Sequence, residues 1–153
     1  MTYDELIESA GRILGIEGLT SDAEGVVHLV SEDEDITIMH CPEVDDAVLF
    51  TARIAALPAD PQDILRRALA SNHAFAATRG ATISLDTDDD SLHLSLYVGI
   101  ERMTPELLLT KIGAFSSALF KLRESLFNET ESSTAPANLE DQEPPLSSGF
   151  IQV

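Results

Sequence analysis

The order of hydrophobic periods along the chain is the feature that most constrains its fold. A helical period comes first, followed by three alternating runs, a second helical period, two more alternating runs, a long helical period and a polar tail. Helices keep apolar residues on one face at steps of three and four, whereas strands alternate. The order predicts an α+β domain in which helices pack on a twisted antiparallel sheet, with the elements α-β-β-β-α-β-β-α.

The first helix is expected over residues 3–14. Thr2 and Glu5 have the spacing of a capping box, and Gly15 stands where a left-handed residue ends a helix. Apolar residues recur between these signals at helical spacing, so the helix is amphipathic.

Three strands are expected at Gly25 to Ser31, Asp35 to Cys41 and Ala47 to Ile54, rich in Val and Ile and separated by acidic turns. Between Ile13 and Thr51 the chain has ten carboxylates and no Lys or Arg. These charges can solvate turns and discourage pairing between sheet edges, so they do not by themselves define a site.

The second half of the domain is expected to contain a helix, a β-hairpin and a long helix. Asp60 is the expected N-cap of a second helix, with Pro61 at its first position. The end of that helix is not readable in the Ala-rich stretch 73–80. A second hairpin follows at residues 81–86 and 91–98, and Thr104 with Pro105 opens the longest helix. The apolar residues of this helix cover fewer than three heptads, which favours packing across the sheet over a coiled coil.

Residues 1–127 therefore form the expected folded domain, and residues 128–153 an acidic tail rich in Ser and Pro. The tail has no cation and few large apolar residues, a composition typical of flexible or loosely attached segments. Its last stretch, 149–153, leaves two alternatives, a short docked strand or a frayed terminus.

Charge and composition exclude several classes of function. The net charge of -18 disfavours binding to a phosphate backbone, so nucleic acid is not an expected partner. No apolar run reaches the roughly 20 residues needed to span a bilayer. The lone Cys41 forms no internal disulfide, and no signal peptide is apparent, so we expect a soluble cytoplasmic protein.

Candidate chemical sites are weak. Asp86, Asp88 and Asp90 have the spacing of a calcium loop, but the glycine and the final glutamate of that motif are missing. Neighbouring His40 and Cys41 should point to opposite faces of a strand. The remaining histidines fall on separate elements, and no phosphate-binding glycine loop or nucleophile motif is present. We therefore expect no catalytic residue, metal or cofactor.

Several segments together resemble the Tir chaperone (CesT-like) family of class I type III secretion chaperones. They are Leu14 and Gly15 at the end of the first helix, the acidic-turn strands, and the stretches 57–60, 69–72 and 80–86. The resemblance covers roughly residues 3–127. The long tail and the Ala-rich stretch after Asn72 depart from the family pattern.

The resemblance implies a homodimer in the bacterial cytoplasm that binds the N-terminal segment of a secreted effector by apolar patches and strand addition. We expect effector binding on the first helix and the three-strand meander, with candidates Leu6, Ile13, Val27, Leu29, Ile36 and Ile38. Periodicity alone does not separate an exposed binding face from a core face, so we expect some of these residues to be core. The resemblance places the dimer interface on the second helix and the fourth strand, with candidates Leu65, Leu69, Asn72, Ile83 and Leu85.

Two other classes remain open on the sequence alone. An acidic immunity protein or inhibitor would cap a basic partner with its carboxylates and would lose affinity steeply with salt. A small enzyme using Cys41 or a histidine has no motif in its favour.

Overall fold

The computed structural model describes residues 1–31 and 34–127. Its elements are α1 (Tyr3–Leu14), β1 (Val26–Val30), β2 (Asp35–Cys41), β3 (Ala47–Ala56), α2 (Gln62–Asn72), a 3₁₀ turn (His73–Phe75), β4 (Thr82–Asp86), β5 (Ser91–Gly99) and α3 (Pro105–Phe127). This is the element order that the hydrophobic periods predict, and the α+β fold class is confirmed. The expectations for residues 128–153 lie outside the described residues.

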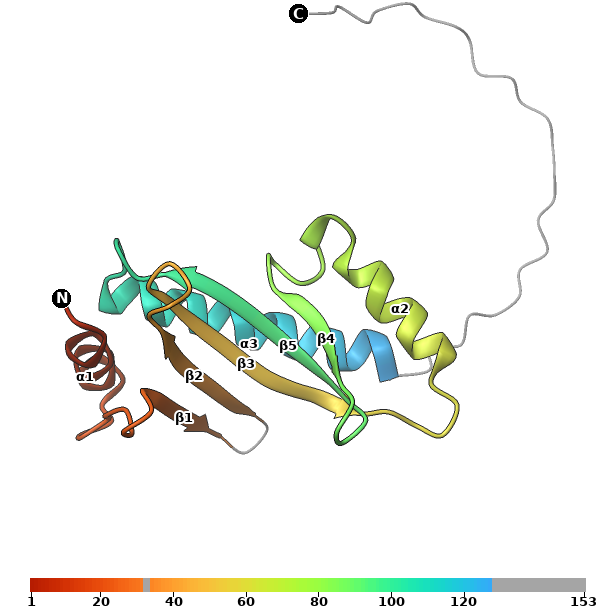
Figure 1. Ribbon diagram of the computed structural model, residues 1–153, viewed down its shortest axis with the longest axis horizontal. Coiled ribbons are helices and arrows are strands. Elements are labelled where there is room, and N and C mark those ends of the chain that lie inside the picture. The colour runs from red at the N-terminus through yellow and green to blue at the C-terminus, as the bar shows by residue number, and fades with distance from the viewer. Residues whose placement is uncertain (32–33, 128–153) are drawn as a thin grey trace, which may run out of the picture.

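The five strands form one antiparallel sheet in the order β1-β2-β3-β5-β4, so β1 and β4 are its two edges (Figure 1). Register pairs such as Ile38 with Phe50, and Phe50 with Leu96, place the large apolar side chains on one face. The opposite face carries a row that includes Thr37, Thr51 and Ser95. The sheet therefore has one apolar side to bury.

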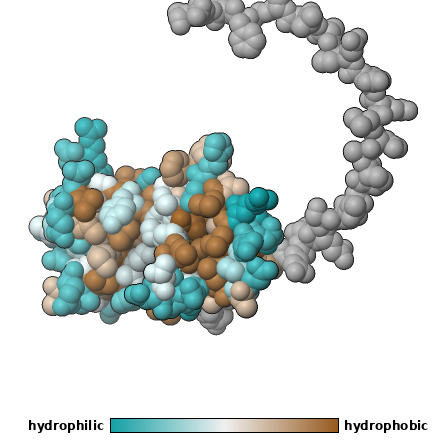
Figure 2. All heavy atoms as spheres, turned by 45° about the vertical axis from the view of Figure 1, so that its right-hand side comes forward, coloured by the Kyte–Doolittle hydropathy of each residue, from teal (hydrophilic) through white to brown (hydrophobic). Residues whose placement is uncertain are grey.

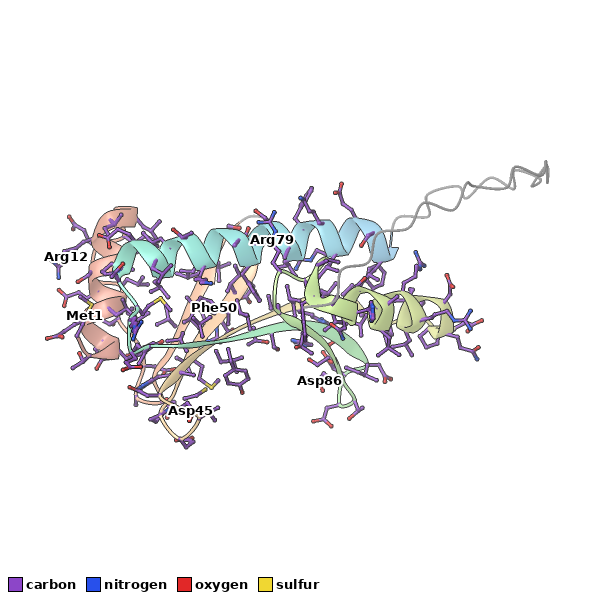
Figure 3. All side chains as sticks on the ribbon, turned by 90° about the horizontal axis from the view of Figure 1, so that it is seen from above. Met1, Arg12, Asp45, Phe50, Arg79 and Asp86 are labelled. Atoms are coloured by element: carbon purple, nitrogen blue, oxygen red, sulfur yellow. The ribbon has the colours of Figure 1, made fainter. Side chains whose placement is uncertain are left out.

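Helix α3 runs along the apolar face of the sheet and buries it (Figure 3). Five of the six stripe residues of α3 are buried, namely Leu108, Phe115, Leu119, Leu122 and Leu126. Phe115 meets Phe50 of β3 with the ring centroids 5.9 Å apart. The expected packing across the sheet is confirmed, because the stripe contacts strands of the same chain.

Helix α1 begins and ends as its sequence predicts. The Thr2 hydroxyl accepts from the Glu5 N–H at 3.2 Å, and a Glu5 carboxylate oxygen accepts from the Thr2 N–H at 2.8 Å. Gly15 has φ 73° and ends the helix. Tyr3 stacks on His40 of β2 with the ring centroids 4.7 Å apart, and its burial raises the pKa of the Tyr3 hydroxyl, with Asp4 and Asp22 adding to the effect.

The start of α2 differs from the expectation. The helix begins at Gln62, and Pro61 rather than Asp60 occupies the N-cap position, without a capping hydrogen bond from a side chain. Pro61 has φ -91° and ψ 0°, outside the helical region, so the helix starts one residue later than proposed. The Ala-rich stretch after Asn72 begins with a 3₁₀ turn, His73–Phe75, in which Ala74 and Phe75 have positive φ. The boundaries of four strands also shift, by one or two residues.

Candidate functional site: an apolar groove beside an open strand edge

An apolar groove of about 540 Å³ lies where α1 ends, beside β1 and against α3. Its apolar walls come from Leu14 at the end of α1, from Ile16 and Leu19 in the segment that follows, from the β1–β2 hairpin, and from Ile112 on α3. The polar side chains at its rim include His28, Ser31, Glu34 and Ser116. The Ser116 hydroxyl donates to a Glu34 carboxylate oxygen at 2.9 Å, which ties α3 to the hairpin. The groove is therefore apolar inside with an acidic group at its edge.

The β1 edge beside this groove has unused backbone groups. The His40 N–H donates to the Gly25 carbonyl at 3.1 Å, which fixes the alternation of the ladder. The backbone N–H and C=O groups of Val27 and Leu29 also face β2, because they follow Gly25 by two and four residues. The backbone groups of Val26, His28 and Val30 therefore face outward. A strand edge with free N–H and C=O groups is a template for another strand.

Asp22 limits how far this open edge extends. One Asp22 carboxylate oxygen accepts from the Val26 N–H at 2.7 Å, and the Asp22 N–H donates to the Val26 carbonyl at 2.9 Å. Both outward groups of Val26 are thus satisfied within the chain. Among the described residues, the outward groups of His28 and Val30 have no such partner. The available edge is the half of β1 that borders the groove.

The β4 edge at the other end of the sheet is blocked at Ile83 by a side chain of α2. The Asn72 Nδ2 donates to the Ile83 carbonyl at 3.0 Å, and the Asn72 Oδ1 accepts from the Ile83 N–H at 2.8 Å. The side chain satisfies both outward groups of Ile83, the second residue of β4. Strand addition at β4 would require breaking this pair of bonds.

The six side chains proposed for effector binding separate into two groups. Leu6, Val27, Ile36 and Ile38 are at most 3% exposed and belong to the core. Ile13 is 53% exposed, and Leu29 is partly buried and lines the groove. Ile36 also lines the groove, as part of its buried floor. Of the six, Ile13 and Leu29 are the accessible ones.

The sequence analysis did not propose the groove residues on either side of β1. Leu14, which is 49% exposed, ends the apolar stripe of α1, and Ile16, which is 43% exposed, follows in the turn, where no period marks it. Gly11 lets the segment after α1 pack closely against the helix, because a Cβ at position 11 would lie 2.6 Å from the Leu19 Cβ. A glycine within the amphipathic stripe of the first helix was the signal that could have indicated this close approach.

The residues proposed for the dimer interface lie together on α2 and β4. Leu69 is 72% exposed and Leu85 is 44% exposed, while Leu65 is partly buried and Ile83 is buried. Phe75, in the turn after α2, adds a side chain that is 51% exposed. Figure 2 brings this side of the molecule forward and shows hydrophobic side chains gathered there. The surface is apolar and has no covering element among the described residues.

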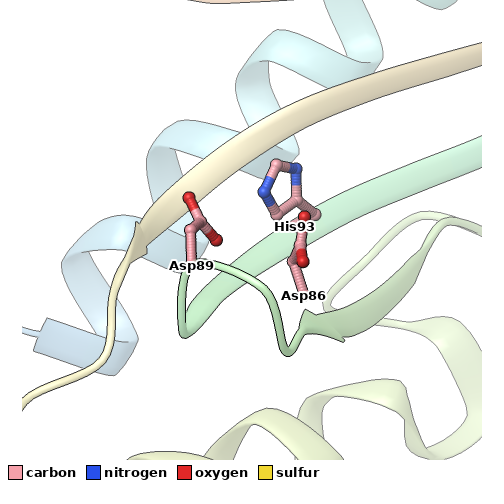
Figure 4. A group of neighbouring side chains, drawn as sticks. All are labelled: Asp86, Asp89 and His93. Carbon is pink, nitrogen blue, oxygen red and sulfur yellow. The ribbon is translucent and has the colours of Figure 1, made fainter.

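The carboxylates of the β4–β5 turn form a hydrogen-bond network with a histidine. Ligand atoms of Asp86, Asp89 and His93 lie within 4.8 Å of one another (Figure 4). One Asp89 oxygen accepts from the buried Ser91 hydroxyl at 2.5 Å, and the other pairs with Arg53 at 3.2 Å. The His93 Nε2 also contacts the Ser91 hydroxyl at 2.9 Å. These contacts use both oxygens of Asp89 and hold the hairpin to β3.

A sequence model of the Tir chaperone protein (CesT) family matches residues 5–123. The chain belongs to this family. The match includes all of β1–β5 and α2, most of α1 and α3, and therefore both the groove and the α2–β4 surface. Among curated protein sequences, none matches this chain significantly.

Solved structures with the same fold include several complexes of secretion chaperones. The SchA–HopA1 chaperone–effector complex contains a chain that is 18% identical, with TM-score 0.68, covering 80% of this chain and 93% of that chain. A chain of the ExsC–ExsE complex is 15% identical with TM-score 0.70, and the match covers 83% of this chain and 95% of that chain. The Yersinia pestis type III secretion chaperone SycH, in complex with a fragment of YscM2, is 19% identical with TM-score 0.63, and the match covers 79% of this chain and 99% of that chain. At these identities the likeness establishes the fold.

No helix among the described residues is long and apolar enough to cross a membrane.

Proposed function

We propose that this CesT-family protein is a type III secretion chaperone. It binds the N-terminal segment of a secreted effector in the bacterial cytoplasm, without catalysis, nucleotide or metal. The observation that carries the proposal is the apolar groove beside the open half of β1. Family membership and the chaperone complexes among the structural relatives support it.

The groove and the edge suit an extended segment rather than a folded partner. A strand added to β1 would bond through the backbone groups of His28 and Val30. Because side chains alternate along a strand, every second residue of the segment would point toward α3 and enter the groove. The backbone bonds give affinity for any sequence, and the groove selects apolar side chains at alternate positions.

The charge around the groove indicates which segments are excluded. Glu34 lies at the rim, and the stretch from Ile13 to Thr51 that supplies most of the groove has no Lys or Arg. A strongly acidic segment would meet repulsion here, whereas a neutral or basic segment would not. We therefore expect cargo with apolar residues at alternate positions and few carboxylates.

The α2–β4 surface supports the homodimer that the family resemblance implies. A two-fold interface places the same patch of each subunit against its copy, so exposed Leu69, Phe75 and Leu85 would be covered in both subunits. This surface lies at the opposite end of the sheet from the groove. One dimer would thus offer two grooves to one segment or to two.

The test uses the N-terminal segment of a secreted protein encoded in the neighbouring reading frame, with binding measured by calorimetry. The groove variant is Ile16→Asp and the matched control is Val44→Asp, since the two side chains are 43% and 46% exposed and Val44 is not in the groove. Ile16→Asp should weaken binding at least about tenfold, or roughly 1.4 kcal/mol, and Val44→Asp should not. Equal affinities of Ile16→Asp and the unmodified protein would contradict the placement of the site.

A salt series on the same complex separates this proposal from an acidic inhibitor of a basic protein. Binding by an apolar groove and backbone bonds should change little between low and high ionic strength, whereas binding by surface carboxylates weakens steeply. A steep loss of affinity would favour the inhibitor.

A further inference from the structure

Two cations of α3, Lys111 and Lys121, and Arg79 in the loop before β4 are defined here as the basic strip. Arg79 and Lys111 both line a small pocket of about 70 Å³ between the loop before β4 and α3. Lys121 lies ten residues further along α3, about 15 Å at 1.5 Å per residue. Figure 3 shows Arg79 beside α3.

The basic strip is unusual because of the charge of the whole chain. The protein has nine Lys and Arg against 27 Asp and Glu. Arg12, Arg53 and Arg67 each pair with a carboxylate, and Arg123 donates to the backbone carbonyls of Arg53 and Ile54. Among the described residues, no carboxylate pairs with a cation of the basic strip. The strip is thus a surface that an acidic segment fits.

We propose that the acidic tail of this chain folds back and docks on the basic strip. The tail, residues 128–153, has five carboxylates and no cation, in two groups: Glu129 with Glu131, and Glu140 with Asp141 and Glu143. It begins directly after α3 ends at Phe127. The occupant is therefore a segment of opposite charge that is already attached to the same helix.

The spacing of the two acidic groups matches that of the cations. From Phe127 back to Lys121 is about 9 Å along the helix and back to Lys111 about 24 Å, at 1.5 Å per residue. Glu131 is close enough in sequence to reach Lys121. Residue 140 is 13 residues beyond Phe127, and a flexible chain of that length has a root-mean-square span of about 20 Å. The second group would therefore reach Lys111 and Arg79 with only a small extension beyond that span.

Attachment makes weak contacts sufficient. Single ion pairs at a surface contribute little, but a tethered segment experiences an effective concentration in the millimolar range. The docking should be sensitive to salt, because charges at a surface are screened within roughly 10 Å at 0.1 M and 3 Å at 1 M salt. It does not depend on cargo binding, since none of the three cations lines the groove.

The experiment places a nitroxide spin label on the tail of the full chain. Gln142→Cys in a Cys41→Ser background gives one labelling site, because Cys41 is the only native cysteine. At 0.1 M salt or below, the label should broaden the amide signals of residues 78–80 and 107–121 more than those of β1 and β2. At 1 M salt the broadening should disappear.

Charge variants complete the test. Lys111→Gln with Lys121→Glu should abolish the selective broadening. Arg66→Glu is the matched control, because Arg66 is exposed on α2, has no ion pair with a described residue and lies outside the strip. Broadening that is absent at low salt, spread evenly over the domain, or unchanged by the strip variants would overturn the proposal. Mixing labelled protein with isotope-labelled protein tells docking within a subunit from docking on its partner.

Discussion

The side-chain amide of Asn72, the last residue of α2, bonds to both backbone groups of Ile83 at 3.0 and 2.8 Å. Ile83 is the second residue of the edge strand β4, and its side chain is buried. One side chain therefore anchors α2 to the sheet and closes that edge at Ile83. A strand that added along the whole of β4 would have to break these bonds, whereas the half of β1 that borders the groove has no such bonds among the described residues.

Removing this amide should destabilise the fold. Asn72→Ala leaves the Ile83 N–H and C=O without partners at a partly buried site, and each lost bond of this kind costs about 1–3 kcal/mol. Urea unfolding measures the change, with Ser71→Ala as the control, since the Ser71 hydroxyl bonds only to a carbonyl of its own helix. A loss no larger than that of the control would mean that the Asn72 bonds contribute nothing net.

The apolar α2–β4 surface leads to a prediction about the dimer. Leu69→Glu puts a charge on a side chain that is 72% exposed, so the subunit should fold normally while a two-fold interface would bring two carboxylates together. Sedimentation at micromolar concentration should show a dimer for the unmodified protein and a monomer for the variant. Leu107→Glu, on an exposed side chain of α3, should leave the dimer intact. A monomeric unmodified protein would contradict the interface.

The sequence predicted the elements well because each has its own period and its own start or stop residue. Thr2 with Glu5 and Gly15 mark α1 by local bonds alone, and the structure confirms them. Asp60 was wrong as a cap because the conformation of Pro61 decided where α2 begins. A helix end can be predicted from the sequence when the hydrogen bonds that define it join residues no more than four positions apart.

The candidate site was harder to predict because it depends on contacts between distant segments. The apolar positions of β1 and β2 alternate alike whether a side chain is core, as Val27 is, or lines a groove, as Leu29 does. The wall at Ile112 comes from α3, which follows β1 by more than 70 residues. The closing of β4 by Asn72 likewise requires the position of α2 in space.

Core and groove positions should respond differently to polar substitution. Ile38→Ser should cost roughly 2–5 kcal/mol of folding stability, because Ile38 is 1% exposed in the core. Leu29→Ser should cost less, because Leu29 is only partly buried, and it should weaken effector binding. Thermal unfolding and calorimetry on both variants separate the effects. If Ile38→Ser and Leu29→Ser lost the same stability, and Leu29→Ser did not selectively weaken binding, Leu29 would not be part of the effector site.

Truncation after Asn128 should leave folding almost unchanged. The tail has few large apolar residues, and docking through surface charges contributes little to stability at physiological salt. Calorimetry should give melting temperatures within about 5 °C of each other, a difference worth on the order of 1–2 kcal/mol. A larger fall would show that Phe150 and Ile151 are docked on the folded domain.

Two glycines of the groove region should respond to alanine with opposite signs. Gly11→Ala would place a Cβ 2.6 Å from the Leu19 Cβ, so the turn that forms the groove lip must move, at about 1–3 kcal/mol. Gly113 lies at an exposed position of α3, and a Cβ added there would have no atom within 4 Å. Gly113→Ala should therefore raise the free energy of unfolding by roughly 0.5–1 kcal/mol, because alanine has fewer conformations than glycine in the unfolded chain. Urea unfolding of both variants gives the two signs. Since the displaced lip carries Leu14 and Ile16, Gly11→Ala should also weaken effector binding in the folded protein, and unchanged binding would show that the lip does not contact the effector.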